Sequence, residues 1–161
     1  MQRALIAVLI AAAGFVWYTS LGLPPELASH FGPGGTPNGF TGRGVYTAVM
    51  LGMVVGVPLF VASTARLTHV LPVELINFPN KAYWLAPERR AATLEALSSL
   101  STAFALAVTL FLSFCHWLIV QANAVQPARL QESWLFAGLA VFGVAMVLWV
   151  VSLFRRFGRA S

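Results

Sequence analysis

Residues 134–154 read WLFAGLAVFGVAMVLWVVSLF, an uninterrupted apolar stretch that contains no charged side chain and is followed at once by Arg155 and Arg156. A helix needs roughly 20 apolar residues to cross the hydrocarbon core of a bilayer, so this stretch predicts a transmembrane helix. Three further stretches of similar length also lack Asp, Glu, Lys and Arg, namely residues 4–23, 45–65 and 98–120. The sequence therefore predicts an all-α membrane protein with four spans in a single domain, residues 1–161.

The composition agrees with a chain that is solvated by lipid. Of its 161 residues, 58% are hydrophobic and only 9% are charged, whereas soluble domains carry about 25% charged residues. The formal net charge of +5 is assigned to the membrane surface, because the chain offers no soluble basic face for nucleic acid. The single cysteine, Cys115, excludes an internal disulfide framework and a cysteine-rich metal site.

Basic residues collect on one side of the predicted spans. On that side lie Arg3, Arg66, Lys81, Arg89, Arg90, Arg155, Arg156 and Arg159, and on the other only Arg43 and Arg129. The positive-inside rule then places both termini and residues 66–97 in the cytoplasm, and residues 24–44 and 121–133 outside. The apolar run of the first span continues past the length of a signal-peptide core, so an uncleaved first helix is predicted.

Aromatic residues near the segment ends are typical of the belts that form at membrane surfaces. They are Trp17, Tyr18, Tyr46, Tyr83, Trp84, Trp117 and Trp134.

The first outer loop, LPPELASHFGPGGTPNGFTGRG at residues 23–44, is too short for a domain. Pro24 and Pro25 favour the start of a helical turn, which would bring Glu26 and His30 onto one face. The glycines and prolines that follow favour tight turns over regular structure. We expect a structured cap or a binding lip.

A metal site is one hypothesis for this outer face. Glu26, His30 and His116, with Cys115 as a fourth candidate, offer the carboxylate and imidazole ligands that suit a divalent metal such as zinc. A structural polar network and a titrating switch are the two alternatives. The ligands have no spacing signature, so the sequence leaves all three open.

Small residues recur at four-residue spacing in the second span, at Ala48, Gly52 and Gly56. This spacing lets helix backbones approach closely in lipid. It predicts either packing within the chain or a homodimer through this face. Pro58 is expected to kink the helix or to be absorbed by its neighbours.

The cytoplasmic segment 66–97 is the one sizeable polar region. Pro87 is predicted to begin a helix that continues into the third span. Phe78, Tyr83, Trp84 and Leu85, alternating with Lys81, Arg89 and Arg90, predict a piece lying in the headgroup layer. A docking site for a partner is the alternative, and its candidate residues are Asn77, Asn80, Tyr83, Trp84, Glu88, Arg89 and Arg90.

Two of these stretches resemble motifs of the bacterial SdpI-like integral-membrane proteins. In the cytoplasmic block INFPNKAYWLAPERR the matching residues are Asn77, Pro79, Asn80, Lys81, Tyr83, Trp84, Leu85, Pro87, Glu88, Arg89 and Arg90. In the outer loop they are Pro24, His30, Gly35 and Pro37. The resemblance implies a stand-alone, N-terminal four-helix domain in the bacterial inner membrane. It also implies an immunity-like or regulatory role, since SdpI-like members protect cells from a membrane-active peptide and sequester a repressor.

Catalysis is not indicated by any motif. The chain lacks aspartate, and HExxH, GxSxG and a phosphate-binding glycine loop are absent from its sequence. We therefore expect a non-catalytic binding, regulatory or immunity-like module without a cofactor, whose outer cap around Glu26, His30 and Arg43 binds a peptide or protein. The alternatives are an accessory subunit of a transporter or membrane enzyme complex and a metal-binding membrane protein.

Overall fold

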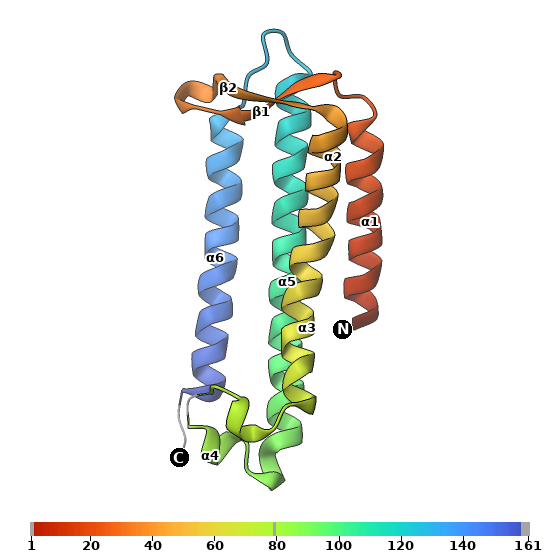
Figure 1. The fold of residues 1–161 in the computed structure, drawn as a ribbon. Helices are drawn as coiled ribbons and strands as arrows, with labels where there is room; N and C mark the ends of the chain where they lie inside the picture. Colours follow the sequence, from red (N-terminus) through yellow and green to blue (C-terminus); the bar gives the residue numbers. More distant parts are fainter. Residues whose placement is uncertain (1, 79, 159–161) are drawn as a thin grey trace.

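Four long apolar helices stand side by side in the computed structural model, which describes residues 2–78 and 80–158 (Figure 1). The candidate spans are helix α1 (Gln2–Ser20), a second helix from Arg43 to Val70, α5 (Pro87–Asn123) and α6 (Glu132–Phe157). The four predicted spans are thus confirmed, because each expected apolar core coincides with one of these helices. The chain is a multi-pass membrane protein.

The two ends of the bundle differ in structure. One end of the bundle, here called the hairpin end, carries a two-stranded sheet. The opposite end, here called the basic end, carries the segment between the second span and α5, and α6 ends there (Figure 1). This second segment contains the short helices η3 (Val73–Leu75) and α4 (Lys81–Trp84).

Helix α5 is the longest element, with 37 residues. Pro87 occupies its first turn, as predicted, because proline there lacks only an N–H that no helix residue would bond. At 1.5 Å per residue α5 is about 55 Å long, against about 30 Å for the hydrocarbon core. Its first turns therefore extend beyond the apolar layer at the basic end.

The second span consists of α2 (Arg43–Leu51), a π-helical turn η2 (Gly52–Gly56) and α3 (Val57–Val70). The π turn ends two residues before Pro58, which is buried. Such a local change of helix geometry satisfies backbone groups that a proline would leave unbonded in lipid. The proline is absorbed here within one continuous span.

The outer loop is a β-hairpin, so the predicted helical turn at Pro24 is wrong. Strands β1 (Glu26–Phe31) and β2 (Pro37–Gly42) pair antiparallel, with Leu27 opposite Thr41 and Ala28 opposite Phe40. The short 3-10 turn η1 (Pro33–Gly35) reverses the chain. A single helical turn leaves nearly all of its backbone groups unbonded, whereas strand pairing bonds alternate residues of each strand to the other strand.

The hydrophobic core lies between α1, the second span and α5. One buried cluster joins Leu5 and Leu9 to Ala105, and the next joins Ala12 and Val16 to Val54. A third cluster, Leu23, Leu27 and Tyr46, lies beneath the hairpin. Tyr46, which the aromatic-belt prediction placed at the membrane surface, is therefore a core residue.

Helix α6 stands apart from this three-helix core and packs mainly on α5 (Figure 1). Ring contacts connect the two helices along their length: Phe104 with Trp149, Phe111 with Phe142, and Trp117 with Trp134. The indole N–H of Trp149 also donates to the carbonyl of Leu100 at 2.9 Å.

The small residues of the second span do not pack inside the chain. Ala48, Gly52 and Gly56 are all exposed, and a β-carbon added to Gly52 or Gly56 would meet no atom within 4 Å. Intra-chain packing through this face is excluded for the described residues, while the homodimer remains a prediction.

Candidate functional site

The polar centre of the bundle is His116, whose side chain is 0% exposed. Its Nε2 lies 2.7 Å from the hydroxyl of Thr19 on α1, and its Nδ1 lies 2.9 Å from the hydroxyl of Tyr46 on α2. One imidazole from α5 thus joins the three helices of the core just below the hairpin.

The hydrogen bonds define which nitrogen of His116 carries the proton. Thr19 donates its only hydroxyl hydrogen to the carbonyl of Phe15 at 2.7 Å, so its oxygen accepts from Nε2–H. Nδ1 is then the acceptor, and Tyr46 donates to it. Every hydrogen in this network has an acceptor when the imidazole is neutral.

Aromatic rings enclose the imidazole. Phe15 meets it edge-on at a centroid distance of 5.6 Å, and Tyr46 stacks on it at 5.7 Å. A ring with both nitrogens bonded and no exposed surface has the arrangement of a structural polar network, one of the three alternatives that the sequence leaves open.

The predicted metal ligands are not brought together. Glu26 and His30 lie on β1, where residues four apart are separated by about 13 Å, rather than the roughly 6 Å of a helix. His30 Nδ1 lies 3.0 Å from the hydroxyl of Ser29, and both nitrogens of His116 are engaged elsewhere. Within residues 2–78 and 80–158, no three His, Cys, Asp or Glu side chains form a group that could hold a metal.

The hairpin is fastened to α5 through Asn123, a residue that the sequence analysis does not single out. Its side-chain oxygen accepts from the N–H of Ala28, and its side-chain amide donates to the carbonyl of Ala28, both at 2.9 Å. A carboxamide mimics a strand backbone in this pairing. The outer edge of β1 is therefore occupied by the end of α5.

The turn of the hairpin is fastened to the start of α6. Leu130 N–H donates to the carbonyl of Gly35 at 2.9 Å, and Glu132 accepts from the N–H of Gly34 at 2.8 Å. Gly35 has φ +69, and a β-carbon there would lie 2.0 Å from the carbonyl oxygen of Leu130. Only glycine fits this close approach.

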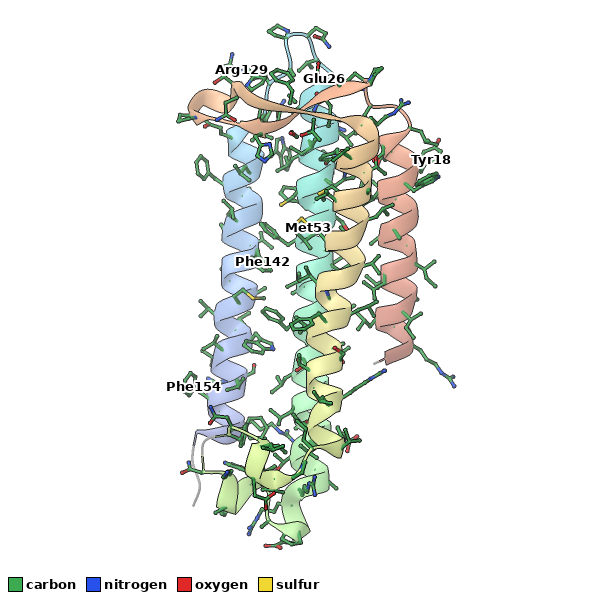
Figure 2. All side chains as sticks on the ribbon, viewed as in Figure 1. Tyr18, Glu26, Met53, Arg129, Phe142 and Phe154 are labelled. Atoms are coloured by element: carbon green, nitrogen blue, oxygen red, sulfur yellow. The ribbon has the colours of Figure 1, made fainter. Side chains whose placement is uncertain are left out.

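Arg43 fastens the two ends of the hairpin region to each other. Its N–H donates to the carbonyl of Pro25 at 2.9 Å, and its guanidinium donates to the carbonyls of Leu21 and Leu23 at 3.2 and 3.0 Å. Arg43 therefore has a structural role at the start of α2. Figure 2 shows the hairpin lying across the end of the bundle, with Glu26 and Arg129 at this end.

The side chains of the hairpin that face away from the bundle are exposed to solvent. Glu26, His30 and Asn38 are exposed, and Phe40 is 61% exposed. Of the site predicted at the outer cap, Glu26 and His30 thus lie on an anchored, accessible strand, whereas Arg43 begins α2.

At the basic end, the predicted partner-binding residues divide into two groups. Asn77, Asn80 and Glu88 are exposed, whereas Tyr83, Trp84, Arg89 and Arg90 are half-buried. Asn80 adopts the left-handed conformation, φ 53, at the start of α4, as expected for a turn-forming asparagine. Pro79, which belongs to the same sequence block, lies outside the described residues.

The basic residues of this block hold the block itself together. The guanidinium of Arg89 lies 4.1 Å from the ring centre of Tyr83 and 3.4 Å from the carboxylate of Glu88. Arg90 donates to the carbonyl of Leu71 at 3.1 Å. These contacts give both arginines a structural explanation.

The apolar residues of the same block form a small core. Ile76, Leu85 and Leu94 are buried together, and the rings of Phe78 and Trp84 meet the buried ring of Phe157 edge-on. Leu85, which the sequence analysis assigns to the headgroup layer, is inside the protein. The segment clasps the end of α6.

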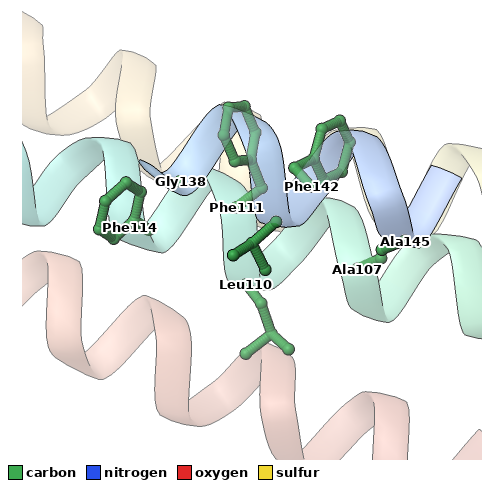
Figure 3. Close-up of a pocket in the computed structure, with 8 residues that line it drawn as sticks. Ala107, Leu110, Phe111, Phe114, Gly138, Phe142 and Ala145 are labelled. Carbon is green, nitrogen blue, oxygen red and sulfur yellow. The ribbon is translucent and has the colours of Figure 1, made fainter. Parts of the chain in front are cut away.

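An apolar groove of about 320 Å³ separates α5 from α6 on one side (Figure 3). It is lined by Ala107, Leu110, Phe111, Phe114, Gly138, Val141, Phe142 and Ala145. Its lining offers apolar contacts of the kind that a lipid chain fills in a bilayer.

No family model, curated protein or solved structure matches this chain.

Proposed function

We propose that this protein is a non-catalytic membrane module that binds an extended peptide at its hairpin end. The hairpin is the main support for this proposal. It is hydrogen-bonded to α2, α5 and α6, and several of its side chains are nevertheless exposed to solvent. An anchored surface binds at low entropic cost, because little of it has to become ordered on binding.

The free edge of β2 supplies the mode of binding. Since both backbone groups of Ala28 bond Asn123, Ala28 and its partner Phe40 form a pair without mutual hydrogen bonds. In such a pair the N–H and carbonyl of Phe40 face the outer edge of β2. A peptide strand added there gains main-chain hydrogen bonds, and the ring of Phe40 gives it an apolar contact.

The resemblance to SdpI-like proteins supports an immunity-like role for this module in the bacterial inner membrane. In that role the ligand is a membrane-active peptide that arrives from outside the cell. The positive-inside rule supports the matching orientation, with the hairpin outside and both termini in the cytoplasm.

The test compares Phe40→Ala with Phe154→Ala in bacteria that express the protein and are challenged with a panel of membrane-active peptides. Phe40 on β2 and Phe154 on α6 are 61% and 65% exposed, so the two variants remove similar apolar surface from different places. We expect wild type and Phe154→Ala to protect the cells and Phe40→Ala to lose protection. Equal protection by all three proteins would remove the hairpin from the mechanism, and absence of protection by wild type would contradict the immunity-like role.

An accessory subunit is the second candidate function, and the exposed small-residue face of Ala48, Gly52 and Gly56 favours it. A helix of a second copy or of another subunit can approach such a face closely. Gly52→Leu, which fills that face without an internal clash, should dissociate a stoichiometric complex purified in mild detergent. An unchanged particle mass on mass photometry would count against this candidate.

A further inference from the structure

A groove of about 250 Å³ lies between α1, α3 and α5 at the basic end of the bundle. Its apolar lining comes from Leu5, Ile6, Leu59 and Ala62. Its polar lining comes from Ser63, Arg66, Ser98 and Thr102. This mixture distinguishes it from the groove between α5 and α6, whose lining residues are all apolar or glycine.

The charged group lies at the surface side of the groove. Helix α3 runs from the hairpin end to the basic end, so Arg66 lies further toward the basic end than Leu59 and Ala62. Helix α5 runs the other way, so Ser98 also lies on the basic-end side of Thr102. An apolar groove with a cation at its surface side matches an anionic phospholipid, whose charge lies at the membrane surface.

The hydroxyl groups around the groove already have hydrogen-bond partners within the protein. Ser63 donates to the carbonyl of Phe60 at 2.7 Å, and Thr102 donates to the carbonyl of Ser98 at 2.7 Å. The hydroxyl of Ser98 lies 3.0 Å from Nε2 of His69, which ties the end of α3 to α5. The hydroxyl groups thus shape the polar end of the groove more than they supply free donors.

Arg66 is the group in this lining that lacks a partner. Among the residues that the structure describes, its guanidinium makes no hydrogen bond or ion pair, and no acidic side chain lines the groove. Arg3 lies three residues before Ile6 on α1, and residues at this spacing share a helix face. The mouth of the groove therefore has an excess of positive charge.

We propose that this groove binds one anionic phospholipid from the leaflet at the basic end. The phosphate pairs with the guanidinium of Arg66, for which phosphate is a matching bidentate acceptor. One acyl chain lies along Leu5, Ile6, Leu59 and Ala62. Basic pockets between transmembrane helices have the chemistry that recognises anionic headgroups.

Native mass spectrometry of the full chain in mild detergent tests this proposal. The protein is mixed with equal amounts of phosphatidylglycerol and phosphatidylcholine, and the ratio of the two bound lipids is measured for wild type, Arg66→Gln and Arg155→Gln. Arg155 is the matched control, because it is an exposed arginine at the same end but does not line the groove. We expect wild type to prefer phosphatidylglycerol, Arg66→Gln to lose about fivefold of that preference, and Arg155→Gln to keep it.

A second pair of variants tests the groove itself without changing charge. Ser63 and Thr64 are adjacent, exposed, and each donates to a backbone carbonyl three residues earlier, but only Ser63 lines the groove. Ser63→Phe should lower the bound fraction of phosphatidylglycerol, and Thr64→Phe should leave it unchanged.

Three results would overturn the proposal. The first is an equal loss of preference in Arg66→Gln and Arg155→Gln, which would mean attraction by the total charge. The second is an equal effect of phenylalanine at positions 63 and 64. The third is binding of inorganic phosphate to wild type but not to Arg66→Gln, with no preference of wild type for phosphatidylglycerol over phosphatidylcholine, which would make the groove a site for a free anion.

Discussion

At the scale of single residues, His116 connects three helices through bonds that substitutions can separate one at a time. Its partners lie 97 and 70 residues away in the chain, at Thr19 and Tyr46. Thr19 keeps a second partner in the carbonyl of Phe15 if the imidazole is removed. Among the described residues, the Tyr46 hydroxyl has no hydrogen-bond partner other than His116, so it is the sensitive member of the network.

Removing His116 should therefore cost more than removing the hydroxyl of Tyr46. We expect Tyr46→Phe to lower the free energy of unfolding by about 1 kcal/mol, as single hydrogen bonds between membrane helices do. His116→Leu leaves the Tyr46 hydroxyl buried and unbonded, at a cost of about 1–3 kcal/mol. The double variant should lose less than the sum of the two, since both polar groups are then gone. Unfolding in detergent, followed by circular dichroism, measures all three, and strictly additive losses would contradict the network.

Gly34 and Gly35 are required for different reasons, the first for its backbone conformation alone and the second also for lack of space. Both have positive φ, at +76 and +69, but an added β-carbon meets nothing within 4 Å at Gly34 and the Leu130 carbonyl oxygen at Gly35. Gly34→Ala should cost only the left-handed conformation, about 1–2 kcal/mol. Gly35→Ala should cost more and release the hairpin from α6.

Limited proteolysis in the hairpin, together with thermal unfolding, compares these two alanine variants. Rapid cleavage is expected for Gly35→Ala alone. Identical behaviour of the two would mean that the approach of Gly35 to Leu130 does not hold the turn.

At the scale of elements, α6 depends on α5 for most of its packing. A β-carbon added to Gly138 of α6 would lie 2.1 Å from a ring carbon of Phe114 on α5. A β-carbon added to Gly143, which is also on α6, would meet no atom within 4 Å. Replacing Gly138 by alanine therefore tests the contact between α5 and α6, and replacing Gly143 by alanine tests helix propensity alone.

Gly143→Ala should stabilise the protein by up to about 1 kcal/mol, the difference in helix propensity between alanine and glycine. Gly138→Ala has the same propensity gain, but it forces the ring of Phe114 out of its place and should lower stability overall. Thermal unfolding of the two variants decides the matter, and equal stabilisation would mean that α6 has room to move away from α5 at no cost.

At the scale of the whole molecule, the two ends of the bundle have different chemistry. The hairpin end has a sheet fastened to three helices, and the basic end has a small core of Ile76, Leu85 and Leu94 closed over Phe157. A membrane lies between them, so each end faces one compartment only.

Cysteine labelling checks the predicted orientation. In a Cys115→Ala background, Val125→Cys places an exposed thiol at the hairpin end and Leu75→Cys places one at the basic end. In intact bacteria, a membrane-impermeant maleimide should label position 125 and reach position 75 only after lysis. The reverse pattern would contradict the positive-inside prediction.

The spans and their ends were accessible from sequence because lipid imposes a local rule. A backbone in hydrocarbon has to bond its own polar groups, and a long apolar stretch does so as a helix whatever surrounds it. The start of α5 at Pro87 is likewise local, since it follows from the backbone geometry of one residue.

The hairpin, the network around His116 and the small core at the basic end were decided by tertiary structure. Ala28 finds Asn123 across 95 residues, and His116 finds Thr19 across 97. Which residues become partners depends on which helix faces pack together, and this packing cannot be predicted from one segment of the sequence. The sequence determined that four helices span a membrane with most of the basic residues at one end; packing alone decided that His116 bonds inward and that Glu26 and His30 lie apart from it on a strand.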